Sequence, residues 1–320
     1  MRAVVLVGGF GTRLRPLTNT VPKQMLPIVD RPMIEWVVGH LVDHDVDDVV
    51  LALGYRPDAF QDRYPDGRCA GADLHYSVES EPLGTAGAIR FAATDAGIDD
   101  TFIVVNGDVL TDLDLSAMVA VHASHGGEAT IALHEVDDPS RYGVVDLDAG
   151  GRVRRFVEKP AREEAPSHLI NAGTYVLDPS VLERIPFGRG VSIERETFPE
   201  LAADGAMWAV NDDGVYWIDT GTPEDYLQVQ LDLIDGRRPV RIDGIDPTAV
   251  VHPEAIVRRS VAGAHTVIER RAELCDSVIM TGARIGAGAS VRGALVGPFE
   301  VVPDGQVIEP GAVLARDQMA

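Results

Sequence analysis

The sequence has only two cysteines, no long hydrophobic run and no charged-then-apolar leader at its start. Cys69 and Cys275 lie far apart, so we expect two thiols in a reducing compartment rather than a disulfide framework. The longest apolar runs, such as VVLAL and FIVV, have the length of strands. They fall far short of the roughly 20 residues that span a bilayer. We therefore predict a cytoplasmic protein that does not enter a membrane.

Basic residues are also scarce, because 28 Lys and Arg stand against 50 Asp and Glu, a formal net charge of −22. This balance excludes nucleic acid and anionic membrane surfaces as expected partners, since both attract basic proteins. We interpret most of the negative charge as a solvated surface. A basic cluster at Arg13, Arg15 and Lys23 is the exception. Because it follows a glycine-rich turn, it indicates an anion-binding site.

Residues 1–235 alternate strand and helix patterns. The stretch RAVVLVG reads as a buried strand, and Pro32 begins a helix whose apolar face repeats at helical spacing. GTAGAIRFAATDAG reads as a helix of small residues, and a further helix is predicted to start with Thr222 as N-cap, Pro223 at the first helical position and Asp225 at the third. Other strands are expected at DVVLALG, ADLHYSVE, TFIVVNGD, ATIALHEV, GVVDLD, VRRFVEK, LINAGTYVL and VYWID. The alternation predicts an α/β fold with a doubly wound, mostly parallel sheet, which binds ligands at the carboxyl ends of its strands.

The pattern changes after residue 235. We interpret residues 236–247 as a polar, turn-rich linker, and residues 248–320 as hexapeptide repeats that form a short β-helix of about ten short coils. A loose all-β domain stays the alternative. A terminal coil needs a cover, so we predict that this region packs against the first domain or another subunit, giving a homo-oligomer. The repeating aliphatic residues are Val251, Val257, Ile268, Leu274, Ile279, Ile285, Val291, Val296, Val302, Ile308 and Leu314.

The glycine loop fits neither of the two common phosphate-binding motifs. A dinucleotide fingerprint needs a glycine where Leu14 stands, and no Gly-Lys-Ser/Thr run follows the first strand. The segment nevertheless combines a strand, a glycine turn and three basic side chains, and this combination is typical of a phosphate-binding site. No Ser/His/Asp or Cys/His arrangement accompanies them, and the nine histidines are scattered.

The stretch GGFGTRLRPLTNTVPK resembles the signature GGxGTRLxPLTxxxPK of the sugar-1-phosphate nucleotidyltransferases. EPLGTAGA, VNGD, FVEKP, INAG and WIDTGTPEDY follow in the family's order, so the resemblance covers residues 1–235. The hexapeptide tail resembles the left-handed β-helix that many members carry. VEKP, INAGTYVLDPSVLERI and SIERETFP look most like the mannose-1-phosphate guanylyltransferase branch.

The resemblance implies an Mg²⁺-dependent enzyme that converts a nucleoside triphosphate and a sugar 1-phosphate into a nucleotide sugar and pyrophosphate. The branch that it resembles most uses GTP and mannose 1-phosphate. A sugar phosphate is mostly a dianion at neutral pH because its second pKa is near ~6, so it attacks without a general base. The reaction needs charge neutralisation and alignment instead. Alternatives are a thymidylyl- or uridylyltransferase acting on glucose 1-phosphate, a non-catalytic regulatory homologue, and an acyltransferase built on the β-helix.

The family's motifs also imply roles for residues of the glycine loop. Arg13 is expected to hold the β- and γ-phosphates and the leaving pyrophosphate, and Lys23 to reach the α-phosphate and the attacking phosphate. Asp108 and Asp219 are expected to bind Mg²⁺, because each follows an apolar strand and the two would share one end of the sheet. The backbone amides expected to cradle the nucleotide phosphates are those of Gly8, Gly9, Gly11 and Thr12.

The remaining implied contacts concern the base and the sugar. The base is expected to lie against Leu6, Gly8, Gly84 and Thr85. Glu79 stands where the thymidylyl branch has glutamine, and a carboxylate accepts from the two donors of guanine; Glu81 is the alternative acceptor. The residues expected at the sugar phosphate are Gly143, Glu158, Lys159 and Asn171.

Overall fold

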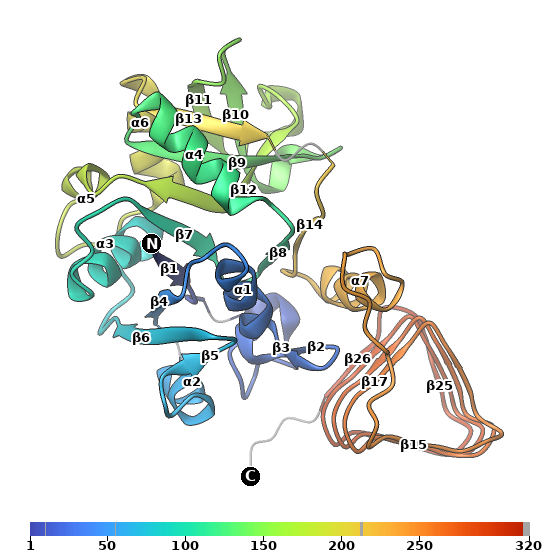
Figure 1. Cartoon of the computed structure of the whole chain (residues 1–320). Coiled ribbons are helices and arrows are strands. Elements are labelled where there is room, and N and C mark those ends of the chain that lie inside the picture. Colours follow the sequence, from blue (N-terminus) through green and yellow to red (C-terminus); the bar gives the residue numbers. More distant parts are fainter. Residues whose placement is uncertain (10, 55, 212–213, 316–320) are drawn as a thin grey trace. The chain divides into compact units, whose positions relative to one another are not determined.

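The computed structural model describes residues 1–9, 11–54, 56–211 and 214–315. Its contacts divide the chain into two compact units, which we describe separately. The first unit holds residues 1–9 and 35–217, and the second holds residues 10–34 and 218–320. The predicted boundaries at 235–236 and 247–248 stay a prediction. Figure 1 labels the elements of both units.

The first unit contains a ten-stranded sheet whose N-terminal part is doubly wound and parallel, as predicted, except for the antiparallel edge strand β5. β1 lies between β4 and β7, and β6 pairs in parallel with β4. The helical face predicted after Pro32 is confirmed, because Ile34, Val38 and Leu41 of α1 are fully buried. The elements of this part are β1 (Arg2–Leu6), α1 (Met33–Val42), β4 (Asp48–Leu53), α2 (Pro57–Arg63), β5 (Arg68–Cys69), β6 (Ala72–Val78), α3 (Gly84–Asp95) and β7 (Phe102–Asn106).

Antiparallel strands extend the sheet on the other side of β7. β12 pairs with β7 and β9, β10 lies between β11 and β12, and β13 adds to β9 in parallel. β13 was not among the predicted strands. The elements are α4 (Leu115–His125), β9 (Ala129–Glu135), η3 (Pro139–Arg141), β10 (Gly143–Leu147), β11 (Val153–Glu158), η4 (Arg162–Glu164), β12 (Leu169–Leu177), α5 (Ser180–Arg184), η5 (Ile193–Thr197), α6 (Phe198–Ala203) and β13 (Met207–Asn211).

One topological expectation is wrong. β14 (Trp217–Asp219), which carries Asp219, is not part of the ten-stranded sheet but pairs with β8 (Val109–Thr111) in a sheet of two strands. Asp108 does follow β7 of the large sheet. A shared sheet edge therefore does not explain how Asp108 and Asp219 would meet.

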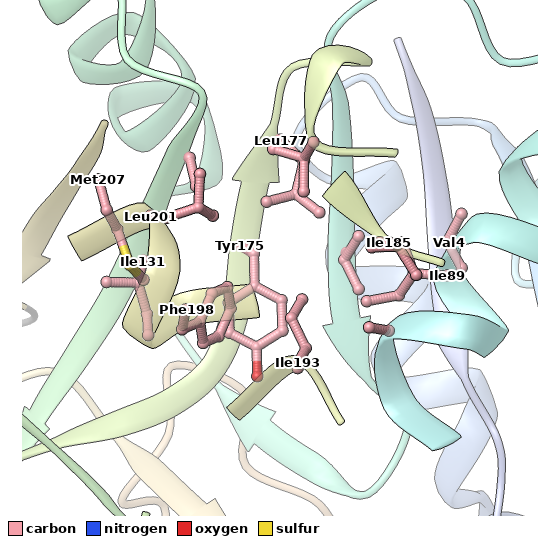
Figure 2. Packing of buried hydrophobic residues seen from close by; sticks show 14 of the residues in the cluster. Val4, Ile89, Ile131, Tyr175, Leu177, Ile185, Ile193, Phe198, Leu201 and Met207 are labelled. Atoms are coloured by element: carbon pink, nitrogen blue, oxygen red, sulfur yellow. The ribbon is translucent and has the colours of Figure 1, made fainter. Parts of the chain in front are cut away.

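A large core cluster of the first unit packs strands of both the parallel and the antiparallel part of the sheet against helices α3, α5 and α6. Tyr175 of β12 packs its ring on Phe198 of α6, with ring centroids 5.0 Å apart at 72° (Figure 2). Phe156 of β11 meets Phe198 from another side at 5.3 Å. These rings are nearly or fully buried, so aromatic packing fixes β12 and its polar residues in place.

The second unit contains the glycine-loop segment and helix α7 (Pro223–Ile234). The predicted start of α7 is confirmed, since Thr222 caps it by accepting from the Asp225 amide at 3.2 Å. Gln230 accepts from the Val29 amide at 3.1 Å, and the Tyr226 hydroxyl donates to the Pro27 carbonyl. These bonds hold α7 on the hairpin that follows the loop. The segment contains η1 (Thr12–Leu14), η2 (Lys23–Met25), β2 (Pro27–Ile28) and β3 (Arg31–Pro32).

The C-terminal strands stack in three parallel sheets, which confirms the predicted left-handed hexapeptide β-helix. Partners in adjacent coils, such as Val250 and Val267, are 17 residues apart. Three hexapeptides therefore make one coil, and the described part has four coils rather than about ten. All predicted aliphatic residues line the interior. The strands are β15 (Val250–Val251), β16 (Ile256–Arg258), β17 (Val261–Ala262), β18 (Val267–Ile268), β19 (Glu273–Cys275), β20 (Val278–Ile279), β21 (Arg284–Ile285), β22 (Ser290–Arg292), β23 (Leu295–Val296), β24 (Val301–Val302), β25 (Val307–Ile308) and β26 (Val313–Leu314).

One face of the β-helix is covered. Val261 of β17 points away from the interior row yet is buried, and α7 contacts β17. The tail thus packs against a segment that precedes the predicted linker, as expected. The homo-oligomer and the cytoplasmic location stay predictions. Neither Cys69 nor Cys275 forms a disulfide, and no helix in the described ranges has the length and apolarity to cross a membrane.

Candidate active site

The glycine loop closes on the stem of Lys23. Gly11 adopts φ +56°, and its carbonyl accepts from the Thr18 hydroxyl at 2.7 Å. A Cβ on Gly11 would lie 3.0 Å from Thr18 Cγ2 and 3.3 Å from Lys23 Cβ. Both the backbone conformation and the space therefore require glycine. Thr12 and Arg13 follow Gly11 in the short helix η1, and the Gly11 backbone lies next to the Lys23 side chain.

Lys23 is a buried cation that faces a predicted metal ligand. Its side chain is only 7% exposed, and its ammonium lies 3.6 Å from a carboxylate oxygen of Asp219. A buried ammonium costs free energy unless an anion compensates it. Asp219 supplies that charge within the second unit, which places two predicted site residues together.

Arg13 approaches the same carboxylate. A Cβ built on Gly221 would lie 2.8 Å from Arg13 Nη2 and 3.0 Å from Asp219 Oδ1. The guanidinium and the carboxylate thus border one small space. Arg13, Lys23 and Asp219, which are far apart in sequence, form one charged group, which we call the cation cluster.

In the first unit, the predicted sugar residue Asn171 contacts Tyr175. Asn171 Nδ2 donates to the Tyr175 hydroxyl at 2.9 Å. Burial, followed by the negative charges of Glu194, Glu158 and Asp108, raises the pKa of Tyr175. The hydroxyl is therefore neutral and lies within electrostatic range of all three carboxylates. Sequence reasoning missed Tyr175, although its position four residues after Asn171 within INAGTYVL was the available signal.

Asn171 sits in a bulge that fixes its amide. Asn171 pairs with Leu133 and Tyr175 with Ile131, so four residues of β12 span two of β9. The Asn171 Oδ1 accepts from the Gly173 amide at 2.8 Å, and Trp217 Nε1 donates to the Ala172 carbonyl at 2.9 Å. Such bulges re-aim side chains next to functional sites.

Gly143 and Glu158 face each other across β10 and β11. A Cβ on Gly143 would collide with the Phe156 ring and lie 3.1 Å from Glu158 Oε2. Glycine is thus needed by the packing of the chain itself. Lys159 places its ammonium 3.2 Å from Glu158 Oε1, but its side chain is 57% exposed. The pair can reorganise when an anion arrives.

The predicted base-binding loop is tied to residues 191–194. The Glu79 carboxylate accepts from the Leu83 amide at 3.0 Å, and burial raises its pKa. A Cβ on Gly84 would lie 2.5 Å from the Val191 carbonyl oxygen. The Thr85 hydroxyl donates to Glu194 at 2.7 Å and accepts from the Ile193 amide at 2.8 Å. Gly84 and Thr85 thus have structural roles, and their contact with a base stays a prediction.

The end of β1 leaves open space. Apart from its chain neighbours, a Cβ on Gly8 or Gly9 would meet no atom of the described residues within 4 Å, and Gly9 has φ +99°. The carbonyl of Leu6 accepts from the Gly107 amide at 2.9 Å, which joins the ends of β1 and β7. This space is compatible with the predicted nucleotide contacts of Leu6, Gly8 and Gly9.

The predicted magnesium ligands are two aspartates, and magnesium binding stays a prediction. Among the described residues, no three His, Cys, Asp or Glu side chains gather into a group that could hold an ion. Asp108 belongs to the first unit and Asp219 to the second. Mg²⁺ commonly takes one or two carboxylates and completes its shell with phosphate oxygens and water. Each aspartate is thus an oxygen donor of the kind that Mg²⁺ takes together with nucleotide phosphates.

Known proteins resemble this chain along both of its parts. Residues 2–236 match the nucleotidyl transferase family, and residues 234–319 match the GlmU-like C-terminal hexapeptide family. A mannose-1-phosphate guanylyltransferase of Mycobacterium tuberculosis is 39% identical over 98% of this chain and 83% of its own length. Mannose-1-phosphate guanylyltransferase 1 of Arabidopsis thaliana is 37% identical over 99% of this chain and 91% of its own.

A solved structure is also similar to this chain. HddC from Yersinia pseudotuberculosis complexed with GMP-PN is 33% identical, with a TM-score of 0.61 over 72% of this chain and 97% of that one. The match to the nucleotidyl transferase family spans residues 2–236, which include the glycine loop, Asp108 and Asp219. The chain belongs to the nucleotidyl transferase family of enzymes and carries a C-terminal hexapeptide β-helix.

Proposed function

We propose that this enzyme transfers the guanylyl group of GTP to mannose 1-phosphate, giving GDP-mannose and pyrophosphate. The cation cluster carries the proposal, because it holds two positive side chains beside a carboxylate suited to magnesium. A phosphate oxygen of the sugar forms a bond to the α-phosphorus. The bond from that phosphorus to the bridging oxygen breaks, and its electron pair leaves on pyrophosphate. No proton has to move.

The residues of the second unit stabilise charge in this step. Lys23 neutralises the α-phosphate as negative charge grows on its oxygens. Arg13 holds the departing pyrophosphate with a guanidinium, whose planar donors match phosphate oxygens. Asp219, with Asp108, would hold Mg²⁺, which supplies further charge neutralisation and orients the phosphates. Because these groups are fixed before the reaction, little reorganisation is needed at the transition state.

The experiment that tests the proposal identifies both products. With GTP, mannose 1-phosphate and Mg²⁺, we expect GDP-mannose and pyrophosphate in a one-to-one ratio. Phosphorus NMR distinguishes pyrophosphate from inorganic phosphate and GMP from GDP-mannose. Formation of GMP or inorganic phosphate without a nucleotide sugar would mean that the enzyme is a hydrolase, and would contradict the proposal.

Relatives named guanylyltransferases and the carboxylate at position 79 favour GTP over dTTP or UTP. Guanine offers N1–H and N2–H₂ to Glu79, whereas a pyrimidine presents acceptors that a carboxylate repels. We expect wild type to prefer GTP to dTTP by about 30- to 1000-fold in kcat/KM, and Glu79→Gln to reduce that preference. Inosine triphosphate, which lacks N2–H₂, should fall between the two. Equal use of GTP and dTTP by wild type would remove Glu79 from base recognition.

The preference should also depend on pH. Burial raises the pKa of Glu79 above 4.5, so its carboxylate takes up a proton closer to neutrality than an exposed glutamate does. The protonated acid no longer accepts two hydrogen bonds from guanine. The ratio of kcat/KM for GTP to that for dTTP should therefore fall as pH falls through this pKa. In Glu79→Gln the ratio should not vary with pH over the same range.

Tyr175 positions the proposed sugar ligand Asn171. Tyr175→Phe removes the acceptor of the Asn171 Nδ2 donor, so we expect KM for the sugar 1-phosphate to rise about tenfold while KM for GTP stays unchanged. Tyr76→Phe is the matched control, because it also removes one hydrogen-bonding hydroxyl, which donates to the Tyr64 carbonyl at 2.8 Å, and Tyr76 is not a proposed site residue. Steady-state kinetics in both substrates measures the effect. Equal KM shifts for both substrates would indicate general loosening instead.

A further inference from the structure

Gly221 is buried and lies two residues after Asp219 of the cation cluster. Its φ is outside the left-handed region, so the backbone at this position accepts alanine. The space around it does not. A Cβ would come within 2.8 Å of Arg13 Nη2, 3.1 Å of Arg13 Cζ and 3.0 Å of Asp219 Oδ1. The reason for glycine here is thus clearance for two charged side chains, not backbone conformation.

The backbone on both sides of Gly221 is fixed. The Thr220 hydroxyl, which is fully buried, donates to Met33 Sδ at 3.3 Å. Thr222 caps α7 through the Asp225 amide and also donates to the Asp225 carboxylate at 2.7 Å. A methyl group at position 221 therefore cannot retreat by moving the main chain. The side-chain ends must move instead, and the atom nearest to the new methyl group belongs to the Arg13 guanidinium.

We propose that Gly221 is a positioning residue, which sets the place of the Arg13 guanidinium beside Asp219 by leaving out a Cβ. This inference rests on the proposed function, in which Arg13 holds the pyrophosphate. Moving the end of a flexible arginine costs the fold little. Moving a charge by about 1 Å in a preorganised site costs catalysis much more. Gly221 thus acts on the reaction through Arg13 and need not touch the substrate.

Gly221→Ala tests the inference. We expect the variant to fold with a melting temperature close to that of wild type, and to lose about 10- to 100-fold in kcat/KM. Affinity for magnesium pyrophosphate, measured by calorimetry, should fall in the same variant. KM for mannose 1-phosphate should stay near the wild-type value. Gly39→Ala is the matched control, because a Cβ there finds no atom closer than 3.9 Å.

A double-mutant cycle with Arg13→Ala separates a positioning role from a structural one. With the guanidinium removed, the nearest contact of the methyl group is gone and only the contact with Asp219 Oδ1 at 3.0 Å remains, so Gly221→Ala should cost less than about 3-fold in that background. If the single variant folds poorly because of the clash, Arg13→Ala should restore the fold of the double variant. An equal loss in both backgrounds, or wild-type pyrophosphate affinity in Gly221→Ala, would overturn the inference.

The calorimetric arm distinguishes this inference from the proposed function. If wild type makes no GDP-mannose but binds magnesium pyrophosphate more tightly than Gly221→Ala does, the substrate assignment fails and the role of Gly221 stands. If wild type makes GDP-mannose and Gly221→Ala matches it, the proposed function stands and the role of Gly221 fails.

Discussion

Asp219→Asn is expected to lower kcat/KM by about 100- to 1000-fold, or roughly 3–4 kcal/mol of transition-state stabilisation. Asparagine keeps the shape of the side chain and one acceptor oxygen, so we expect the variant to fold. It loses the negative charge that faces the Lys23 ammonium at 3.6 Å, and with it a proposed ligand of magnesium. The concentration of Mg²⁺ that gives half-maximal rate should rise in the same variant.

Asp235→Asn serves as the matched control for that experiment. Asp235 belongs to the same unit and also pairs with a cation, Arg259, at 2.8 Å, but this pair lies outside the cation cluster. Asp235→Asn should leave both kcat/KM and the Mg²⁺ concentration for half-maximal rate unchanged. If Asp219→Asn kept turnover within a factor of three of wild type, the assignment of Asp219 to magnesium would be wrong.

Lys23→Met is expected to reduce kcat by about 100- to 1000-fold with a smaller effect on KM for GTP. Methionine replaces most of the buried stem but carries no charge. The ammonium is proposed to act on the α-phosphate, where charge changes most between ground state and transition state, so its loss should appear mainly in kcat. Single-turnover measurement of nucleotide-sugar formation separates this step from product release.

Arg271→Met controls for the loss of one positive charge in this acidic protein. Arg271 forms a surface pair with Glu254 on the β-helix, and its side chain is 71% exposed. Such pairs contribute little, so kinetics should match wild type. If Lys23→Met instead raised KM for GTP tenfold and left kcat unchanged, Lys23 would bind the ground state only, and its proposed catalytic role would be contradicted.

Local patterns were enough to predict much of the fold. The 3.6-residue spacing after Pro32 predicted the buried face of α1, and Thr222 with Asp225 predicted the start of α7. The aliphatic repeat predicted the interior of the β-helix. In each case the residues that determine the element lie within a few positions of one another, so the sequence displays the cause directly.

Features that depend on distant partners were harder to predict. VYWID was read correctly as a strand, yet nothing within it shows that β14 leaves the large sheet to pair with β8. The hexapeptide spacing shows the length of one side of a coil. It does not show that three such sides make one coil, so the number of coils was predicted too high. Tyr175 was not predicted as a site residue. Its role depends on a hydrogen bond with Asn171 and on the negative charges of Glu158, Glu194 and Asp108, which are distant in sequence.

The predicted site residues differ in how directly their positions support their roles. Arg13, Lys23 and Asp219 come together within one unit. Gly84 and Gly143 are explained by contacts inside the chain, because a Cβ at either position would strike Val191 or Phe156. A motif alone cannot separate a glycine that makes room for substrate from one that makes room for the protein.

The most direct test of the central claim is pyrophosphate release by the wild-type enzyme with each of four nucleoside triphosphates, combined with mannose 1-phosphate and with glucose 1-phosphate. We predict the highest kcat/KM for GTP with mannose 1-phosphate, dependence on Mg²⁺, and loss of that activity in Lys23→Met. A higher kcat/KM for dTTP or UTP with glucose 1-phosphate, or no pyrophosphate with any pair, would contradict the account.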